Sequence, residues 1–147
     1  MAAYEGSFHH VAISVRNLEK AKAFYCGLLG FSIVWEHVDR GGPQNSAVVG
    51  LPDVVMDISM LEGYGVRLEL FYYKNPQGRD RGEQRQCDFG LNHFALKVKD
   101  ARAVYAALAE KGVQFNSPPQ ALRPGVVAFY MRDPEGNTVE ILENNVD

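Results

Sequence analysis

Cysteine, excess positive charge and long apolar runs are all scarce in this chain of 147 residues. Its two cysteines, Cys26 and Cys87, lack the spacing of a metal site or a redox pair, so we expect free thiols in a reducing cytoplasm. The formal net charge of −3 argues against a protein that binds nucleic acid through a basic surface. No apolar run approaches the ~20 residues that span a bilayer, and residues 1–7 lack the apolar core of a signal peptide. The sequence therefore predicts a cytoplasmic protein with no nucleic-acid and no membrane partner.

An internal repeat organises the rest of the chain. Residues 8–17 read FHHVAISVRN and residues 91–100 read LNHFALKVKD, so both contain His-x-Ala-x-x-Val, then a basic residue, then Asn or Asp. Alternation of apolar and polar residues predicts a strand in each segment. His10 and His93 then lie on the same face of equivalent strands, whereas His9 faces the other side and is interpreted as a surface residue. The length fits one domain, or two small modules that share one core.

Each predicted strand is followed by a helix with recognisable ends. Asn17 and Asp100 are good N-caps, and Gly30 and Gly112 follow the last apolar residue at helical spacing. Further strand-like runs occupy residues 32–37, 45–49, 55–61 and 66–73 in the first half, and 113–116, 126–132 and 137–142 in the second. The predicted order is β-α-β-β-β, twice. Residues 75–88 between the halves are polar, and we interpret them as a linker that is either a solvated loop or a mobile lid over an anionic substrate.

The last predicted strand of each half carries one acidic residue inside an apolar run. These residues are Glu69 and Glu140, and alternation places both on the faces that bear His10 and His93 if the strands pair in register. An isolated ionised carboxylate that faces an interior is costly, so it needs a cation, a strong hydrogen-bond network or a raised pKa. Two acids and two histidines at matching places in a repeated unit point to a metal site.

Several motifs resemble those of one known family. Residues 10–15 (HVAISV), 23–25 (AFY), 29–31 (LGF) and 133–140 (DPEGNTVE) are very similar to the opening and closing motifs of vicinal-oxygen-chelate, or glyoxalase-like, proteins. The resemblance covers roughly residues 8 to 143. It implies an α+β fold in which two paired βαβββ modules form a curved eight-stranded mixed sheet around a metal-binding cleft. The whole chain, 1–147, would then be a single domain with module 1 at about 8–74, a linker at about 75–88 and module 2 at about 89–143.

The resemblance also implies a ligand set and a chemistry. In this family the first and last strands of each module supply metal ligands, which correspond here to His10, Glu69, His93 and Glu140. The cofactor would be one divalent ion per site, and Ni, Co, Zn, Mn and Fe(II) all suit these ligands. Similarity to glyoxalase I and methylmalonyl-CoA epimerase implies an isomerase, epimerase or lyase that acts alpha to a carbonyl of a small chelating substrate. A ligand carboxylate would take and return the proton, Glu140 before Glu69 as the candidate catalytic base.

Three other functions remain open within the same fold. An extradiol-type Fe(II) dioxygenase would use two histidines and one carboxylate, and Tyr130 lies where such enzymes place a tyrosine, but Glu69 adds a fourth ligand. A fosfomycin-type thiol transferase also uses three protein ligands. A metal-free small-molecule or antibiotic-binding protein would be expected to lack several of the four. The resemblance further implies a homodimer, because open sheet edges need cover, with the metal site formed within one chain or across the dimer.

Overall fold

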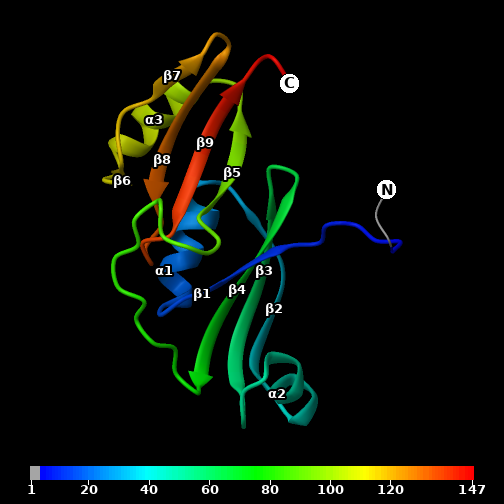
Figure 1. Ribbon diagram of the computed structural model, residues 1–147. Coiled ribbons are helices and arrows are strands. Elements are labelled where there is room, and N and C mark those ends of the chain that lie inside the picture. Colours follow the sequence, from blue (N-terminus) through cyan, green and yellow to red (C-terminus); the bar gives the residue numbers. More distant parts are fainter. Residues whose placement is uncertain (1–3) are drawn as a thin grey trace. The chain divides into compact units, whose positions relative to one another are not determined.

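The computed structural model describes residues 4–147, which divide into two compact units between Arg79 and Asp80 (Figure 1). The division falls within the predicted linker. Each unit holds its own mixed sheet with helical cover, and each is described by itself below.

The first unit contains a four-stranded sheet in the order β1-β4-β3-β2. Strands β1 and β4 are parallel, and the other neighbouring strands are antiparallel. Its elements are β1 (Val11–Ser14), α1 (Leu18–Lys22), the π-helical turn η1 (Ala23–Leu28), β2 (Ser32–Gly41), α2 (Pro43–Val49), β3 (Val55–Gly63) and β4 (Val66–Asn75).

The second unit contains a five-stranded sheet in the order β5-β9-β8-β6, with β7 paired to β8 beside this path. Strands β5 and β9 are parallel, as β1 and β4 are in the first unit. Its elements are β5 (His93–Val98), α3 (Ala101–Ala109), β6 (Gln114–Phe115), β7 (Gln120–Arg123), β8 (Val126–Arg132) and β9 (Thr138–Asn144).

Local signals in the sequence explain where the predicted helices begin. The side chain of Asn17 accepts a hydrogen bond from the backbone N–H of Lys20 at 2.9 Å, and that of Asp100 accepts one from Ala103 at 2.9 Å. These bonds satisfy N–H groups that the first helical turn leaves without a partner. Both predicted N-caps are therefore confirmed.

In each unit, the residues on either side of the acidic residue along its strand are buried on the opposite face of the sheet. In β4, Leu68 and Leu70 are buried on either side of Glu69, and in β9, Val139 and Ile141 are buried on either side of Glu140. Because successive strand residues point to opposite faces, both glutamates are directed away from these buried leucine, valine and isoleucine side chains. The predicted alternation is confirmed in both units.

Two predictions about secondary structure were incomplete or wrong. Residues 45–49 were predicted as a strand but belong to helix α2, which starts with Pro43 after Gly42 and ends at Gly50 in the left-handed conformation. Helix start and stop signals thus outweighed the strand preference of Val48 and Val49. Strand β7 was missed because all of its residues are exposed and carry no apolar alternation.

The α+β prediction is confirmed, and residues 4–147 hold nine strands in two sheets of four and five, in place of the predicted eight in one sheet. Within this range no helix is long and apolar enough to cross a membrane.

Candidate functional site

The first unit brings His10 and Glu69 together. His10 directly precedes β1, and Ala12, two residues further, pairs with Glu69 across the parallel β1–β4 ladder. The Nε2 atom of His10 lies 3.0 Å from Oε2 of Glu69. The histidine side chain is 35% exposed and the glutamate side chain 12%, so the pair opens to solvent on the imidazole side.

The second unit repeats this arrangement with His93 and Glu140. His93 begins β5, and Ala95, again two residues further, pairs with Glu140 across the parallel β5–β9 ladder. Nε2 of His93 lies 3.0 Å from Oε2 of Glu140, and the two side chains are 29% and 14% exposed. The same diagonal offset therefore produces the same distance in both units.

Each pair has the donor atoms of a metal site but not a full set. Imidazole nitrogen and carboxylate oxygen are common ligands of Zn, Fe, Co, Ni and Mn. Among residues 4–147 no group of three or more His, Cys, Asp or Glu side chains is arranged to hold a metal ion. Each unit on its own thus provides two of the four predicted ligands.

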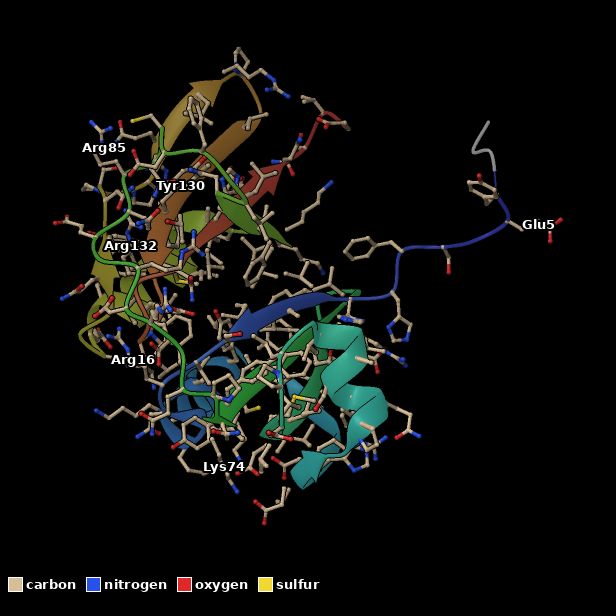
Figure 2. All side chains as sticks on the ribbon, turned by 60° about the horizontal axis from the view of Figure 1, so that its bottom comes forward. Glu5, Arg16, Lys74, Arg85, Tyr130 and Arg132 are labelled. Atoms are coloured by element: carbon tan, nitrogen blue, oxygen red, sulfur yellow. The ribbon has the colours of Figure 1, made fainter. Side chains whose placement is uncertain are left out.

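The surroundings of the two glutamates differ in polarity. Met60 on β3 lies opposite Glu69, whereas Tyr130 on β8 lies opposite Glu140 and its ring centre is 4.9 Å from that of His93 (Figure 2). Burial, and then the charge of Glu140, raise the pKa of the Tyr130 phenol. The second pair consequently has a polar hydroxyl-bearing neighbour that the first pair lacks on the equivalent strand.

An apolar cluster lies on the same face of β4 as Glu69. Phe71 and Tyr73 follow Glu69 at two-residue intervals, and their rings stack with centres 5.8 Å apart. Burial, and then the charge of Glu69, raise the pKa of Tyr73. These two rings pack with Trp35 and Val49 against a buried group in and before β3, which consists of Val54, Met56 and Ile58.

The contacts of the Nδ1 atom of each histidine, the ring nitrogen that does not face the glutamate, were not predicted from the sequence. Nδ1 of His93 lies 2.8 Å from Oδ1 of Asn92, and Nδ1 of His10 lies 2.7 Å from Nδ1 of His9. His9 is exposed, as predicted, and its ring packs edge-on against that of His10. The repeat aligns Asn92 with His9, and that alignment was the available signal.

Part of the predicted linker is held against β9. Gln86 is half-buried and its side chain hydrogen-bonds the Thr138 hydroxyl at 2.6 Å. Arg85 and Asp88, on either side of it, form an ion pair at 2.9 Å. Gln86 therefore ties this end of the linker to the second unit, while Arg85 and Cys87 beside it are exposed, as in a solvated loop. Cys26 and Cys87 are both free thiols, as predicted.

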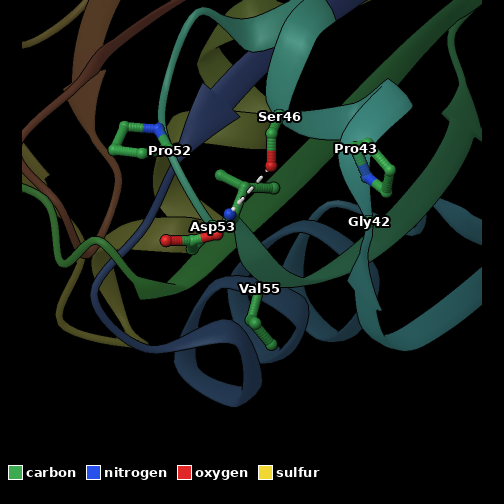
Figure 3. Close-up of a pocket in the computed structure, with 7 residues that line it drawn as sticks. Gly42, Pro43, Ser46, Pro52, Asp53 and Val55 are labelled. Carbon is green, nitrogen blue, oxygen red and sulfur yellow. Dashed lines mark hydrogen bonds between the residues drawn. The ribbon is translucent and has the colours of Figure 1, made fainter.

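A pocket in the first unit lies apart from the predicted ligands. It is formed where α2 meets the segment before β3, and Ser46 accepts a hydrogen bond from the Val54 backbone N–H there at 3.1 Å (Figure 3). Its lining residues are Gly42, Pro43, Ser46, Pro52, Asp53, Val54 and Val55. None of the four predicted ligands contributes to it.

Comparisons with known proteins identify the family of this chain. A family model described as the Glyoxalase/Bleomycin resistance protein/Dioxygenase superfamily matches residues 7–141. The chain is 30% identical over 142 residues to a 2-epi-5-epi-valiolone epimerase from Actinomyces sp., covering 91% of this chain and 77% of the relative. It is 26% identical over 138 residues to a probable lactoylglutathione lyase from Synechocystis sp., covering 92% of this chain and 94% of the relative.

The fold also matches a solved structure of a glyoxalase family protein from Bacillus cereus. The TM-score is 0.87 at 20% identity, and the match covers 99% of both chains. The resemblance inferred from the sequence motifs is thus confirmed by the family model, by curated relatives and by the fold. This chain belongs to the glyoxalase/bleomycin resistance protein/dioxygenase superfamily.

Proposed function

We propose that this protein is a divalent-metal-dependent isomerase, epimerase or lyase that acts on the carbon next to a carbonyl group of a small chelating substrate. In this proposal His10, Glu69, His93 and Glu140 are the ligands of one metal ion, within one chain or across a homodimer, in a cytoplasmic protein. The observation that supports it best is the repetition of a His–Glu pair at 3.0 Å, with the same strand offset, in both units.

The repetition favours a shared role over two separate structural contacts. A single His–Glu hydrogen bond on a sheet is common and needs no metal. Here the two pairs occupy equivalent places in the two units, with Ala12 and Ala95 in the same register, although the residues opposite the glutamates differ, Met60 in one unit and Tyr130 in the other. A histidine nitrogen and a carboxylate oxygen in each unit together supply four donor atoms of the kinds that these divalent metals bind. Relatives named as an epimerase and as a probable lyase support the same class of activity.

The chemistry assigned to the chain is proton transfer by a carboxylate. When bound, the metal would polarise the substrate carbonyl and so acidify the adjacent C–H bond. We assign Glu140 as the group that takes and returns the proton, with Glu69 as the second candidate. Tyr130 opposite Glu140 carries an O–H that can donate to a carboxylate as its charge changes, whereas the thioether of Met60 opposite Glu69 cannot.

Metal content per chain tests the ligand set directly. Protein purified without a histidine tag is analysed for Ni, Co, Zn, Mn and Fe as wild type, His10→Ala and His93→Ala, with His37→Ala on β2 as the matched control. We expect a near-stoichiometric divalent metal in wild type and in the control, and its loss in both other variants. Loss in only one of the two variants would contradict a shared four-ligand site. A wild type that takes up none of these metals on reconstitution would overturn the proposal and favour a metal-free binding protein.

The assigned roles of the glutamates are tested by kinetics after the metal is identified. With 2-oxoaldehyde–thiol adducts and acyl-CoA epimers as first substrates, Glu140→Gln should lower kcat by about 10²- to 10⁴-fold, the range for a lost general base. Glu69→Gln should lower metal affinity more than it lowers kcat at saturating metal. The reverse order would transfer the role of base to Glu69.

One observation favours a second candidate function. The Tyr130 ring beside His93 is compatible with an extradiol-type Fe(II) dioxygenase. Incubation with reduced iron, catechol and oxygen distinguishes the two, because ring cleavage gives a yellow product and proton transfer does not.

A further inference from the structure

The side-chain amide of Asn92 faces Nδ1 of His93, and a backbone carbonyl group determines which way the amide is turned. Its Nδ2 donates to the backbone carbonyl oxygen of Gln86, and its Oδ1 lies 2.8 Å from Nδ1 of His93. A carbonyl oxygen can only accept, so the nitrogen of the Asn92 amide must point to Gln86 and its oxygen to His93. The imidazole must then be the donor, which means that Nδ1 of His93 carries a proton.

Gln86 also binds the other end of the same amide. The partners of its side chain are all satisfied when Nε2 donates to Oδ1 of Asn92 at 2.7 Å and the amide oxygen accepts from Arg132 at 3.0 Å and from the Thr138 hydroxyl at 2.6 Å. Gln86 thus contacts the Asn92 oxygen with its side chain and the Asn92 nitrogen with its backbone. Rotation of the Asn92 amide by half a turn would break both contacts.

The contacts of Gln86 are themselves anchored on two strands. Thr138, at the start of β9, is 4% exposed and also accepts from Nη1 of Arg132 at 2.7 Å. Arg132, labelled in Figure 2, lies at the end of β8. It donates in addition to the backbone carbonyl of Gly136 at 3.2 Å. The network therefore runs from a buried threonine through Gln86 and Asn92 to the ring of His93.

We propose that Asn92 and Gln86 are positioning residues that commit Nδ1 of His93 as a hydrogen-bond donor and leave Nε2 as the nitrogen that binds the metal. This inference rests on the proposed function, because it assigns the device that orients one of its ligands. Nε2 is the atom that faces Glu140, at 3.0 Å, so the nitrogen and the carboxylate oxygen that would bind the metal are directed to the same place in this unit. Outer hydrogen bonds of this kind orient metal-binding histidines and raise their basicity.

Among residues 4–79 the first unit has no such network around His10, which makes it an internal comparison. His9 occupies the place of Asn92 but is exposed, and an imidazole can donate or accept, so it does not determine which nitrogen of His10 carries the proton. Arg132 lies opposite Thr138 across β8 and β9, and the residues at the equivalent positions of the first unit are Glu62 and Arg67. These two form an ion pair at 3.4 Å, which is longer than the 2.7 Å hydrogen bond between Arg132 and Thr138. The positioning device is therefore specific to His93.

Zn²⁺ affinity of the tag-free protein, measured by competition with a chelator, tests the inference in four variants. Asn92→Leu removes the acceptor and should weaken Zn²⁺ binding by about 10- to 100-fold, the usual effect of losing an outer partner. Asn92→Asp keeps an acceptor for Nδ1–H and should bind Zn²⁺ close to wild type. Gln86→Leu should weaken binding less than Asn92→Leu does. Gln84→Leu is the matched control and should have no effect, because Gln84 is an exposed glutamine of the same segment whose side chain donates to the backbone carbonyl of Arg81.

Asn92→Asp separates positioning from a merely structural role. If Asn92 only tied the linker to β5, the aspartate would be as harmful as leucine, because both lose the donor to the Gln86 carbonyl. Equal Zn²⁺ affinity in wild type and Asn92→Leu would likewise overturn the inference while leaving the proposed function intact.

A second measurement does not need the metal. Two-bond ¹H–¹⁵N spectra of histidine-labelled protein report which ring nitrogen of His93 is protonated, with the signal assigned through His93→Gln. We expect the proton on Nδ1 in wild type, with or without Zn²⁺, and its loss in Asn92→Leu. A wild type that binds no Zn²⁺ but keeps the Nδ1 proton would overturn the metal proposal and support the orientation of the ring, whereas an unprotonated Nδ1 would overturn the inference itself.

Discussion

The turn between β8 and β9 is organised by one buried carboxylate, and its removal should destabilise the second unit. Asp133 is 5% exposed, and its oxygens accept from the backbone N–H groups of Glu135 at 2.9 Å and Asn137 at 2.8 Å and from the Asn137 side chain at 3.0 Å. A hydrogen bond to a charged group contributes about 1.5–3 kcal/mol. Because the donors are only half-buried and regain some water contact, we expect Asp133→Ala to cost about 3 kcal/mol, well below the sum of three such bonds.

Thermal unfolding followed by circular dichroism measures this effect. A loss of about 3 kcal/mol should lower the Tm by about 10 °C in a chain of this size. Asp133→Asn is the matched control, since its amide oxygen still accepts from both backbone groups and its nitrogen can donate to a reoriented Asn137. It should lie much closer to wild type. If Asp133→Ala were as stable as Asp133→Asn, the three hydrogen bonds would not be what holds this turn.

Further predictions concern other parts of the chain. Ser59 is fully buried and donates to Glu36 at 2.7 Å, and this bond, followed by that from a lysine, holds the pKa of Glu36 below its usual range. Ser59→Ala should lower the free energy of unfolding by about 1 kcal/mol at neutral pH, as measured by urea unfolding. This difference from wild type should shrink as the pH falls through the folded-state pKa of Glu36, because a depressed carboxyl pKa stabilises the fold only while the group is ionised. Burial raises the pKa of Cys26, whereas Cys87 is exposed, so a chromogenic disulfide reagent should react in a fast and a slow phase, and Cys87→Ser should remove the fast one. Gly41→Ala would place Cβ 2.6 Å from the backbone carbonyl oxygen of Val54. It should lower the free energy of unfolding by about 1–3 kcal/mol in the same assay. An unchanged unfolding midpoint would show that the backbone shifts at little cost.

The sequence was informative about the fold where apolar alternation and helix caps coincide. Strands β1, β4, β5 and β9 carry one apolar and one mixed face, and the helices after Asn17 and Asp100 begin at side chains that cap them. Where those signals were weak or conflicted, prediction failed. All residues of β7 are exposed. The Val-Val pair of α2 is typical of a strand, but Gly42 and Gly50 flank the segment as the two caps of a helix. Periodicity therefore predicts elements that bury one face, and it says little about elements that bury none.

The same limit explains which contacts around the histidines could be predicted. A repeated His and a repeated Glu in apolar strands reveal a pair, because strand register is carried by alternation and each His–Glu contact follows from it. The Gln86–Asn92 network depends on a different kind of information. Gln86 lies in a polar segment without periodicity, 52 residues before the threonine it contacts. Nothing in its neighbours indicates which of the four glutamines and asparagines of residues 75–88 turns inward. Side chains that contact a candidate ligand from a loop are thus the part of a site that only the structure reveals, whereas the candidate ligands, set on paired strands, can be predicted from the pattern of residues.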